Sequence, residues 1–323
     1  MTSPAPQPST RARVLRWLLA IITIGLLVRL GARVAWSDVW ATAVRASPAW
    51  LLVAALVNLA TPAVRGIRWW VFLRAVGSPS VPLAVHAAYV GSGLNNLLPA
   101  SGGDPARALL VARRSSIPSA TALATLTVDR LVEIATYLVL LLAAPLVLSV
   151  PPPLRHAQTV SGLILGALMI AAFLATRMAR DRSPLASGRG RIGSFMARFV
   201  TGVAELPTAR RVVPAMLLSL VAWGLQGATY HLTAVATGLP VSFGASVVAM
   251  LAVNLSFLFP LTPGNVGVFQ VVYAVTLGAY GISSDAAVAT ALLLQAVQIL
   301  PMTALALVLA PDLLFRRARA GAP

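Results

Sequence analysis

Two apolar segments of this chain are interrupted by glycine and proline at corresponding places, one in each half of the sequence. The first reads GSGLNNLLPASGGD over 91–104, and the second reads AVNLSFLFPLTPGN over 252–265. In an alignment of the two, Pro99 matches Pro260, Gly103 matches Gly264 and Asp104 matches Asn265. Proline removes a backbone donor and glycine loosens the helix, so both segments contain peptide groups that lipid could not satisfy. Such paired, broken segments are typical of a transporter-like site inside a membrane.

The composition indicates a polytopic membrane protein. The 323 residues are 58% hydrophobic and only 10% charged, with a mean hydropathy of +0.85. The net charge of +17 comes from arginine alone, because the chain has no lysine. Arginine without lysine, with abundant Ala, Val and Leu, suggests a GC-rich bacterial genome. The arginines gather beside apolar spans, so they predict a bacterial cytoplasmic (inner) membrane and anionic lipids as partners, and no nucleic acid.

The sequence lacks the residue patterns of most membrane-bound catalysts. It contains no cysteine, and His86, His156 and His231 have no metal-ligand spacing. It also lacks Asp-x-Asp, an adjacent acidic pair and a P-loop, which metal-dependent sugar transferases and ATP-driven pumps would need. We therefore expect no enzymatic activity, no cofactor and no metal.

Hydropathy predicts an all-α fold of about six to eight transmembrane helices with two broken or re-entrant hairpins. Pro151-Pro152-Pro153 ends one of the long helices. The predicted helices cover 14–35, 48–73, 119–148, 158–176, 212–237 and 285–309, and the two broken stretches cover 83–112 and 241–280.

The placement of arginine predicts the orientation of the chain. If the arginine-rich ends face the cytoplasm, the first hairpin enters and leaves on the cytoplasmic side and the second on the outside. The segments 48–148 and 212–310 then form a 3+3 inverted repeat, although each broken stretch could instead be two tilted spans. We expect both termini in the cytoplasm, and Arg29, Arg33 and Arg45 count against this topology. The domain prediction is a disordered tail over 1–13, one membrane domain over 14–311 with a basic cytoplasmic loop over 177–211, and a tail over 312–323.

The first half carries a group of candidate charged residues. Asp129 and Glu133 lie one turn apart with Arg130 beside them, and charges inside a span are costly and usually functional. They form either a buried functional cluster or a group at the cytoplasmic boundary. The arginines exceed the acids by one, which suits an anionic headgroup, and the alternative is an ion-pair network that only fixes helix packing. The full candidate cluster is Arg65, Arg68, Asp104, Arg107, Asp129, Arg130 and Glu133.

Polar residues also flank the two breaks. Asn95, Asn96 and Asn254 either cap freed backbone groups or contact a solute. A half-helix opening after Pro263, Gly264 and Gly267 would present free N–H groups to an anion, or it is only a turn. Hydrogen bonding across helices would explain the isolated glutamines, which are Gln270, Gln295 and Gln298.

Four motifs resemble one family, in order and spacing. Arg65-x-x-Arg68-Trp69, Asn95-Asn96-Leu-Leu-Pro99-x-x-Gly102-Gly103-Asp104-x-x-Arg107, Val128-Asp129-Arg130-Leu131 and Thr262-Pro263-Gly264-x-x-Gly267-Val-Phe are similar to the lysylphosphatidylglycerol synthase transmembrane region. The likeness extends over roughly 15–311. In the complete synthases this region moves aminoacylated phosphatidylglycerol between leaflets, and other members are linked to lipid-saccharide assembly. In the complete synthases a separate soluble domain makes that lipid, and we find no such domain in this sequence. The resemblance therefore implies lipid translocation without synthesis.

The chain departs from this family at two positions. The family usually has glutamate where Gln270 stands and arginine where Gln295 stands, so a charged pair across two helices is replaced by a neutral one. This change argues against a titrating acid in the second half.

Together these observations predict a flippase-like protein that translocates or binds an anionic or polyprenyl-linked lipid. The alternatives are a membrane glycosyltransferase or its accessory subunit, and a non-transporting scaffold that binds a protein partner through 177–211.

Overall fold

The computed structural model describes residues 36–97, 102–182, 203, 206–257, 265 and 267–309, with the backbone alone at 38 and 172–182. Every regular element in this part of the chain is an α-helix, as predicted. Five helices are long and apolar enough to cross a membrane, and α7 qualifies through its first twenty residues. These are α3 (Pro48–Leu73), α6 (Ser119–Val147), α7 (Pro152–Arg182), α9 (Ala209–Ala236) and α12 (Ser284–Leu309).

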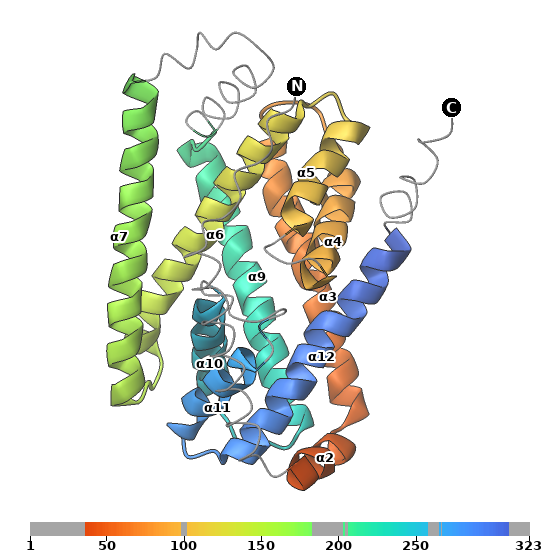
Figure 1. Cartoon of the computed structure of the whole chain (residues 1–323), viewed down its shortest axis with the longest axis vertical. Coiled ribbons are helices and arrows are strands. Elements are labelled where there is room, and N and C mark those ends of the chain that lie inside the picture. The colour runs from red at the N-terminus through yellow and green to blue at the C-terminus, as the bar shows by residue number, and fades with distance from the viewer. Residues whose placement is uncertain are drawn as a thin grey trace, which may run out of the picture.

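The two broken stretches each form a pair of short helices. The first pair is α4 (Val81–Leu97) and α5 (Gly103–Arg114), and the second is α10 (Phe243–Ser256) and α11 (Val268–Gly278). With 11 to 17 residues each, these helices are about 17–26 Å long, less than the roughly 30 Å of a hydrocarbon core. The first pair lies in the upper half of the bundle and the second in the lower half (Figure 1). The chain therefore enters and leaves each pair at one end of the bundle, and the two pairs use opposite ends.

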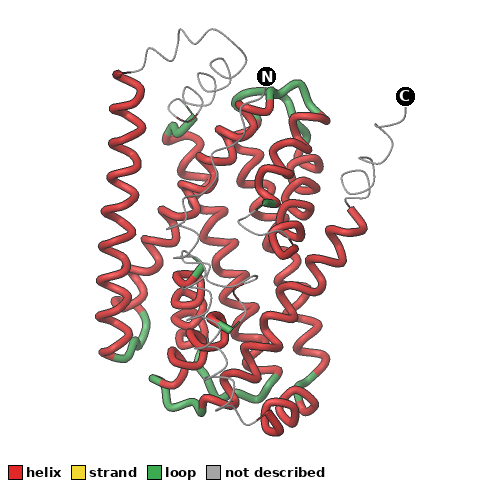
Figure 2. The backbone as a smooth tube through the Cα atoms, in the orientation of Figure 1, coloured by secondary structure: helices red, strands yellow, loops and turns green. Residues whose placement is uncertain are grey.

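Proline and glycine set the ends of the long helices. Pro48 stands in the first turn of α3, where a missing N–H costs nothing, and Pro152 opens α7 in the same way. After α9, Gly238 has a φ of 71°, a left-handed conformation that glycine adopts without strain. The loops that join the long helices to their neighbours lie at the two ends of the bundle, whereas the helix ends that flank the breaks within the short pairs lie in its middle (Figure 2).

Close backbone contact holds the first short pair in place. A Cβ at Gly66 of α3 would lie 2.7 Å from the Cα of Val85 in α4, so α3 and α4 touch through backbone atoms. A Cβ at Gly103 would collide with the carbonyl oxygen of Gly91, which fixes α5 tightly against α4. Small residues at such crossings are typical of helix packing in membranes.

Contacts made by helices of the first half are matched by contacts of the corresponding helices in the second half. α3 packs against α9, and α3 also contacts α12 while α9 contacts α6. In the same manner α4 packs against α12 and α10 contacts α6. These pairs are what an inverted repeat would produce, and the repeat itself stays a prediction, as does the division into domains.

Each short pair has its own apolar core. Trp69, Val90 and Val111 belong to the core around α4 and α5, whereas Leu141, Met250 and Leu294 belong to the core around α10 and α11. Large side chains such as Leu146 and Leu168 point outward on the long helices, as lipid-facing residues of a multi-pass membrane protein do.

Some predictions fall outside the described residues. The helix over 14–35, both tails and most of 177–211 lie there, as do the site candidates Pro99, Pro263 and Gly264. Residues 177–182 continue α7. The sequence did not predict α2 (Trp36–Arg45), a short helix that packs against α12.

Candidate functional site

A bidentate ion pair lies at the centre of the candidate site. Arg68 of α3 donates from Nε to Oδ1 of Asp129 at 2.7 Å and from Nη2 to Oδ2 at 3.0 Å. Arg68 is 1% exposed and Asp129 is fully buried, so the pair lies inside the bundle. Ser219 of α9 accepts a further hydrogen bond from Nη1 of Arg68 at 2.9 Å. A fork of this kind fixes geometry as well as charge.

Glu133 joins three arginines, because it lies one helical turn after Asp129 on the same face of α6. Its Oε2 accepts from Arg130 at 2.7 Å and from Arg68 at 3.1 Å, and its Oε1 lies 3.1 Å from Nη2 of Arg65. Arg130 also forms a second bidentate pair, with Asp104 at the start of α5, at 2.7 and 3.0 Å. The two bidentate pairs thereby hold α3 and α5 against α6.

Arg107 is held differently from the other three arginines. It is 3% exposed, its guanidinium lies 4.3 Å over the ring of Trp69, and its nearest carboxylate is Asp129, at 3.5 Å. Its Nε and Nη2 have no hydrogen-bond partner. The ring in turn is fixed by a hydrogen bond from its Nε1 to Thr125, at 3.1 Å. Arg107 therefore has two guanidinium nitrogens that are free to donate to a ligand.

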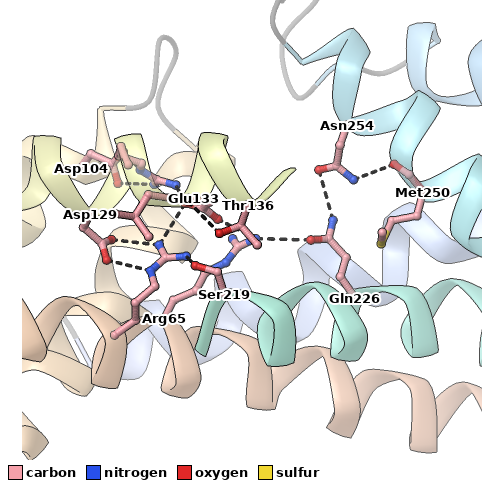
Figure 3. A network of polar contacts seen from close by, with 12 residues as sticks. Arg65, Asp104, Asp129, Glu133, Thr136, Ser219, Gln226, Met250 and Asn254 are labelled. Atoms are coloured by element: carbon pink, nitrogen blue, oxygen red, sulfur yellow. Dashed lines mark hydrogen bonds and ion pairs between the residues drawn. The ribbon is translucent and has the colours of Figure 1, made fainter. Parts of the chain in front are cut away.

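Amide side chains continue the network toward the second half of the chain (Figure 3). Nη2 of Arg65 donates to Gln226 of α9 at 3.3 Å, and Gln226 donates to Asn254 of α10 at 3.3 Å. Asn254 then donates to the carbonyl of Met250 at 2.8 Å. A continuous polar path thus connects the first short pair with the second.

Asn95 and Asn96 stabilise the first short pair. Oδ1 of Asn95 accepts a hydrogen bond from the backbone N–H of Gly103 at 2.8 Å, and Asn96 donates to Thr303 of α12 at 3.3 Å. Asn95 therefore caps a freed backbone group next to Gly102, the residue that precedes α5. Both asparagines also line the cavity described below.

The second half holds a neutral pair where the resemblance in the motifs implies a charged one. Nε2 of Gln270 in α11 donates to Oε1 of Gln295 in α12 at 2.7 Å, which confirms the predicted contact between these helices. Oε1 of Gln270 accepts from the backbone N–H of Gly267 at 2.6 Å. Gly267 has a φ of 87° and directly precedes α11, so the predicted half-helix begins there.

A cavity of about 680 Å³ lies between the two short pairs. Arg65, Arg107 and Arg130 line one part of it, together with Asp104 and Glu133. The remainder is lined by amides, aromatic rings and aliphatic side chains, which include Asn58, Gln226, Asn254, Gln295, Gln298, Trp223, Tyr230, Phe269, Leu165, Ile299 and Met302. A membrane cavity of mixed charge and amide lining can hold a polar headgroup of substantial size.

The structure brings together all seven charged candidates of the first half, and it places them inside the bundle. The Arg68 and Trp69 side chains are buried, although arginine and tryptophan near a helix end are typical of the membrane interface. Ser219, Thr125 and Gln226 belong to the network although no motif in the sequence indicated them. Gln226 could have been identified as a candidate, because it is an isolated amide in an apolar helix, as Gln270 is. Among the described residues no group of acidic or histidine side chains could hold a metal ion.

Comparisons with known proteins support the resemblance seen in the motifs. The family described as the lysylphosphatidylglycerol synthase TM region matches residues 16–306. Glycosyltransferase AglD of Haloferax volcanii is 25% identical over 333 aligned residues, which cover 91% of this chain. The chain spans about half the length of that relative, since the alignment covers 53% of it.

Proposed function

Because the chain belongs to the lysylphosphatidylglycerol synthase transmembrane-region family, a family of membrane proteins of lipid-related function, we propose that it is a flippase-like protein. It binds the headgroup of an anionic or polyprenyl-linked lipid in the cavity and moves that headgroup across the membrane while the chains stay in lipid. The observation that carries this proposal is the cavity itself, a polar space between two short helix pairs that start from opposite ends of the bundle. Charged residues are costly inside a span, and here they line such a space.

The polar path between the pairs supports a mechanism of alternating access. Arg65 and Gln226 connect α3 with α9, and Asn254 extends the connection to α10. A small displacement of one short pair would break or reform these weak 3.3 Å contacts before it disturbed the bidentate pairs. The bidentate pairs would then keep the first half rigid while the cavity opened to either side.

A reconstituted assay tests lipid movement. We expect proteoliposomes with purified chain to expose inner-leaflet, headgroup-labelled phosphatidylglycerol to an impermeant quencher, whereas protein-free liposomes of equal composition expose the outer leaflet alone. Time-resolved quenching measures the rate. Equal traces from both preparations, with the protein shown to be inserted, would contradict the proposal.

The similarity to a glycosyltransferase favours a second candidate function. The chain would then be an accessory subunit of lipid-saccharide assembly, or itself transfer sugar to lipid. Incubation with labelled nucleotide sugar and polyprenyl phosphate distinguishes these candidates, because a labelled lipid formed by the purified chain alone would show catalysis. A scaffold that binds a protein partner through 177–211 would give neither lipid movement nor product.

We propose that the end of the bundle with Arg113 and Arg114 faces the cytoplasm of the bacterial inner membrane. Because the chain lacks cysteine, single cysteines report accessibility cleanly. We expect Ser283→Cys to react with an impermeant maleimide in intact cells and Ser116→Cys to react after permeabilisation alone, since both positions are exposed, at opposite ends of the bundle. The reverse pattern would invert the proposed orientation.

A further inference from the structure

The charged part of the cavity contains guanidinium donors that can bind an anion. Arg107 is almost fully buried, lines the cavity, and has an Nε and an Nη2 without hydrogen-bond partners. Nε of Arg65, another lining residue, also lacks a partner. A buried donor without an acceptor costs free energy, so these groups favour a ligand that supplies acceptor oxygens.

The charge balance of the cluster limits the ligand to one negative charge. Four arginines face three carboxylates, since Asp129 pairs with Arg68, Asp104 with Arg130, and Glu133 bridges Arg65, Arg68 and Arg130. Arg107 supplies the excess positive charge, because its contact with Asp129 is a longer one to a carboxylate that Arg68 already binds in bidentate fashion. A phosphodiester carries one negative charge and would neutralise the cluster, whereas a diphosphate would leave charge unmatched in a poorly solvated site.

The rest of the cavity is neutral. Its lining combines amides such as Gln298, rings such as Trp223 and Phe269, and aliphatic side chains such as Ile299 and Met302. Amides and aromatic faces are suited to hydroxyl groups and to the C–H faces of a polyol or sugar. No carboxylate lines this part among the described residues, and the sequences of 98–101 and 258–264 contain no acid.

Each carboxylate at the cavity is already committed to an arginine. Asp104 accepts both of its hydrogen bonds from Arg130, and Glu133 accepts from Arg68 and Arg130 and forms an ion pair with Arg65. A cationic headgroup would find no acceptor with a free negative charge and would be repelled by Arg107 and Arg65.

We propose, resting on the proposed function, that the cavity selects lipids whose headgroup is a phosphodiester monoanion bearing a neutral, hydroxylated substituent. Phosphatidylglycerol and a glycosyl phosphoryl polyprenol share this chemistry. Lipids that add ammonium groups, such as lysylphosphatidylglycerol with its two amines, and polyprenyl diphosphates are excluded by charge.

Equilibrium binding to purified protein tests this selectivity independently of transport. Native mass spectrometry in detergent compares phosphatidylglycerol with lysylphosphatidylglycerol, a matched pair that differs by the lysyl group. We expect phosphatidylglycerol to bind at least about tenfold more tightly. Parallel binding measurements with a glucosyl phosphoryl polyprenol and a polyprenyl diphosphate show which lipid supplies the preferred headgroup.

Two variants assign the selectivity to residues. Arg107→Gln should weaken phosphatidylglycerol binding by about ten- to a hundredfold, because it removes charged donors without unpairing a carboxylate. Arg113→Gln, an exposed position in the same helix, is the matched control. Gln298→Glu adds a carboxylate to the neutral part and should reduce or reverse the preference against lysylphosphatidylglycerol, with folding checked by size-exclusion chromatography.

The outcomes separate this proposal from the proposed function. Equal affinity for the matched lipids, or unchanged binding in Arg107→Gln, would overturn the selectivity even if both lipids were translocated. Selective binding that Arg107→Gln abolishes would support it even if the quenching assay detected no movement, and in that case the flippase proposal alone would fail.

Discussion

Asp129→Asn is expected to destabilise the folded protein by about 3–5 kcal/mol and to abolish lipid movement. The substitution removes the charge that Arg68 holds through two hydrogen bonds at 2.7 and 3.0 Å, and it leaves a 1% exposed guanidinium without its main counter-ion. It also raises the excess positive charge of the cluster. Thermal unfolding in detergent measures the first effect and the quenching assay the second.

The controls for this prediction separate charge from packing. Arg68→Met combined with Asp129→Leu removes both partners and should unfold at a higher temperature than Asp129→Asn alone, because the buried Arg68 guanidinium is removed together with its main counter-ion. Arg130→Gln should also stop lipid movement, since Asp104 would lose its bidentate partner. Full activity and wild-type stability in both single variants would place these charges in a solvated environment and contradict the buried network.

The helices of the membrane domain could be predicted closely from the sequence because lipid imposes a simple rule. The prediction 48–73 coincides with α3, and 119–148 and 285–309 differ from α6 and α12 by one residue at an end. The prediction 158–176 was six residues too short at each end of α7, so residues 177–182 are helical and do not belong to the predicted loop. Apolar runs of this length have one stable backbone form in lipid, so hydropathy suffices. The helix α2 was missed because Trp36–Arg45 mixes aromatic, polar and charged residues, and its helical form depends on its packing against α12.

The composition of the charged cluster could be predicted, but its location could not. Intramembrane carboxylates at 129 and 133 need cations, and the arginines at 65, 68, 107 and 130 were the available ones. An arginine and tryptophan group near a helix end has the same sequence whether it faces the interface or the bundle interior. Tertiary packing places the side chains of Arg68 and Trp69 in the bundle interior.

The cavity and its neutral part depend on contacts between distant helices. Gln226 joins Arg65 to Asn254 across separations of 161 and 28 residues, and Ser219 reaches Arg68 across 151. A single hydroxyl or amide in an apolar helix does not indicate which neighbour it will meet. The Gln270–Gln295 contact was predictable because two family charges are missing together, and a joint loss indicates that the two positions share one interaction.

Gln295→Arg is expected to destabilise the protein by roughly 2.5–3.5 kcal/mol, since it places an unpaired guanidinium at a buried position in a membrane helix. The double variant Gln270→Glu with Gln295→Arg should recover much of that loss, because the two side chains are 2.7 Å apart and a carboxylate at 270 would meet the new charge. A double-mutant cycle on the thermal unfolding of detergent-solubilised protein measures the coupling energy. The neutral pair Gln270→Met with Gln295→Met serves as the control for lost hydrogen bonding. A coupling energy of zero would mean that these residues do not touch, and the packing of α11 against α12 would then be wrong.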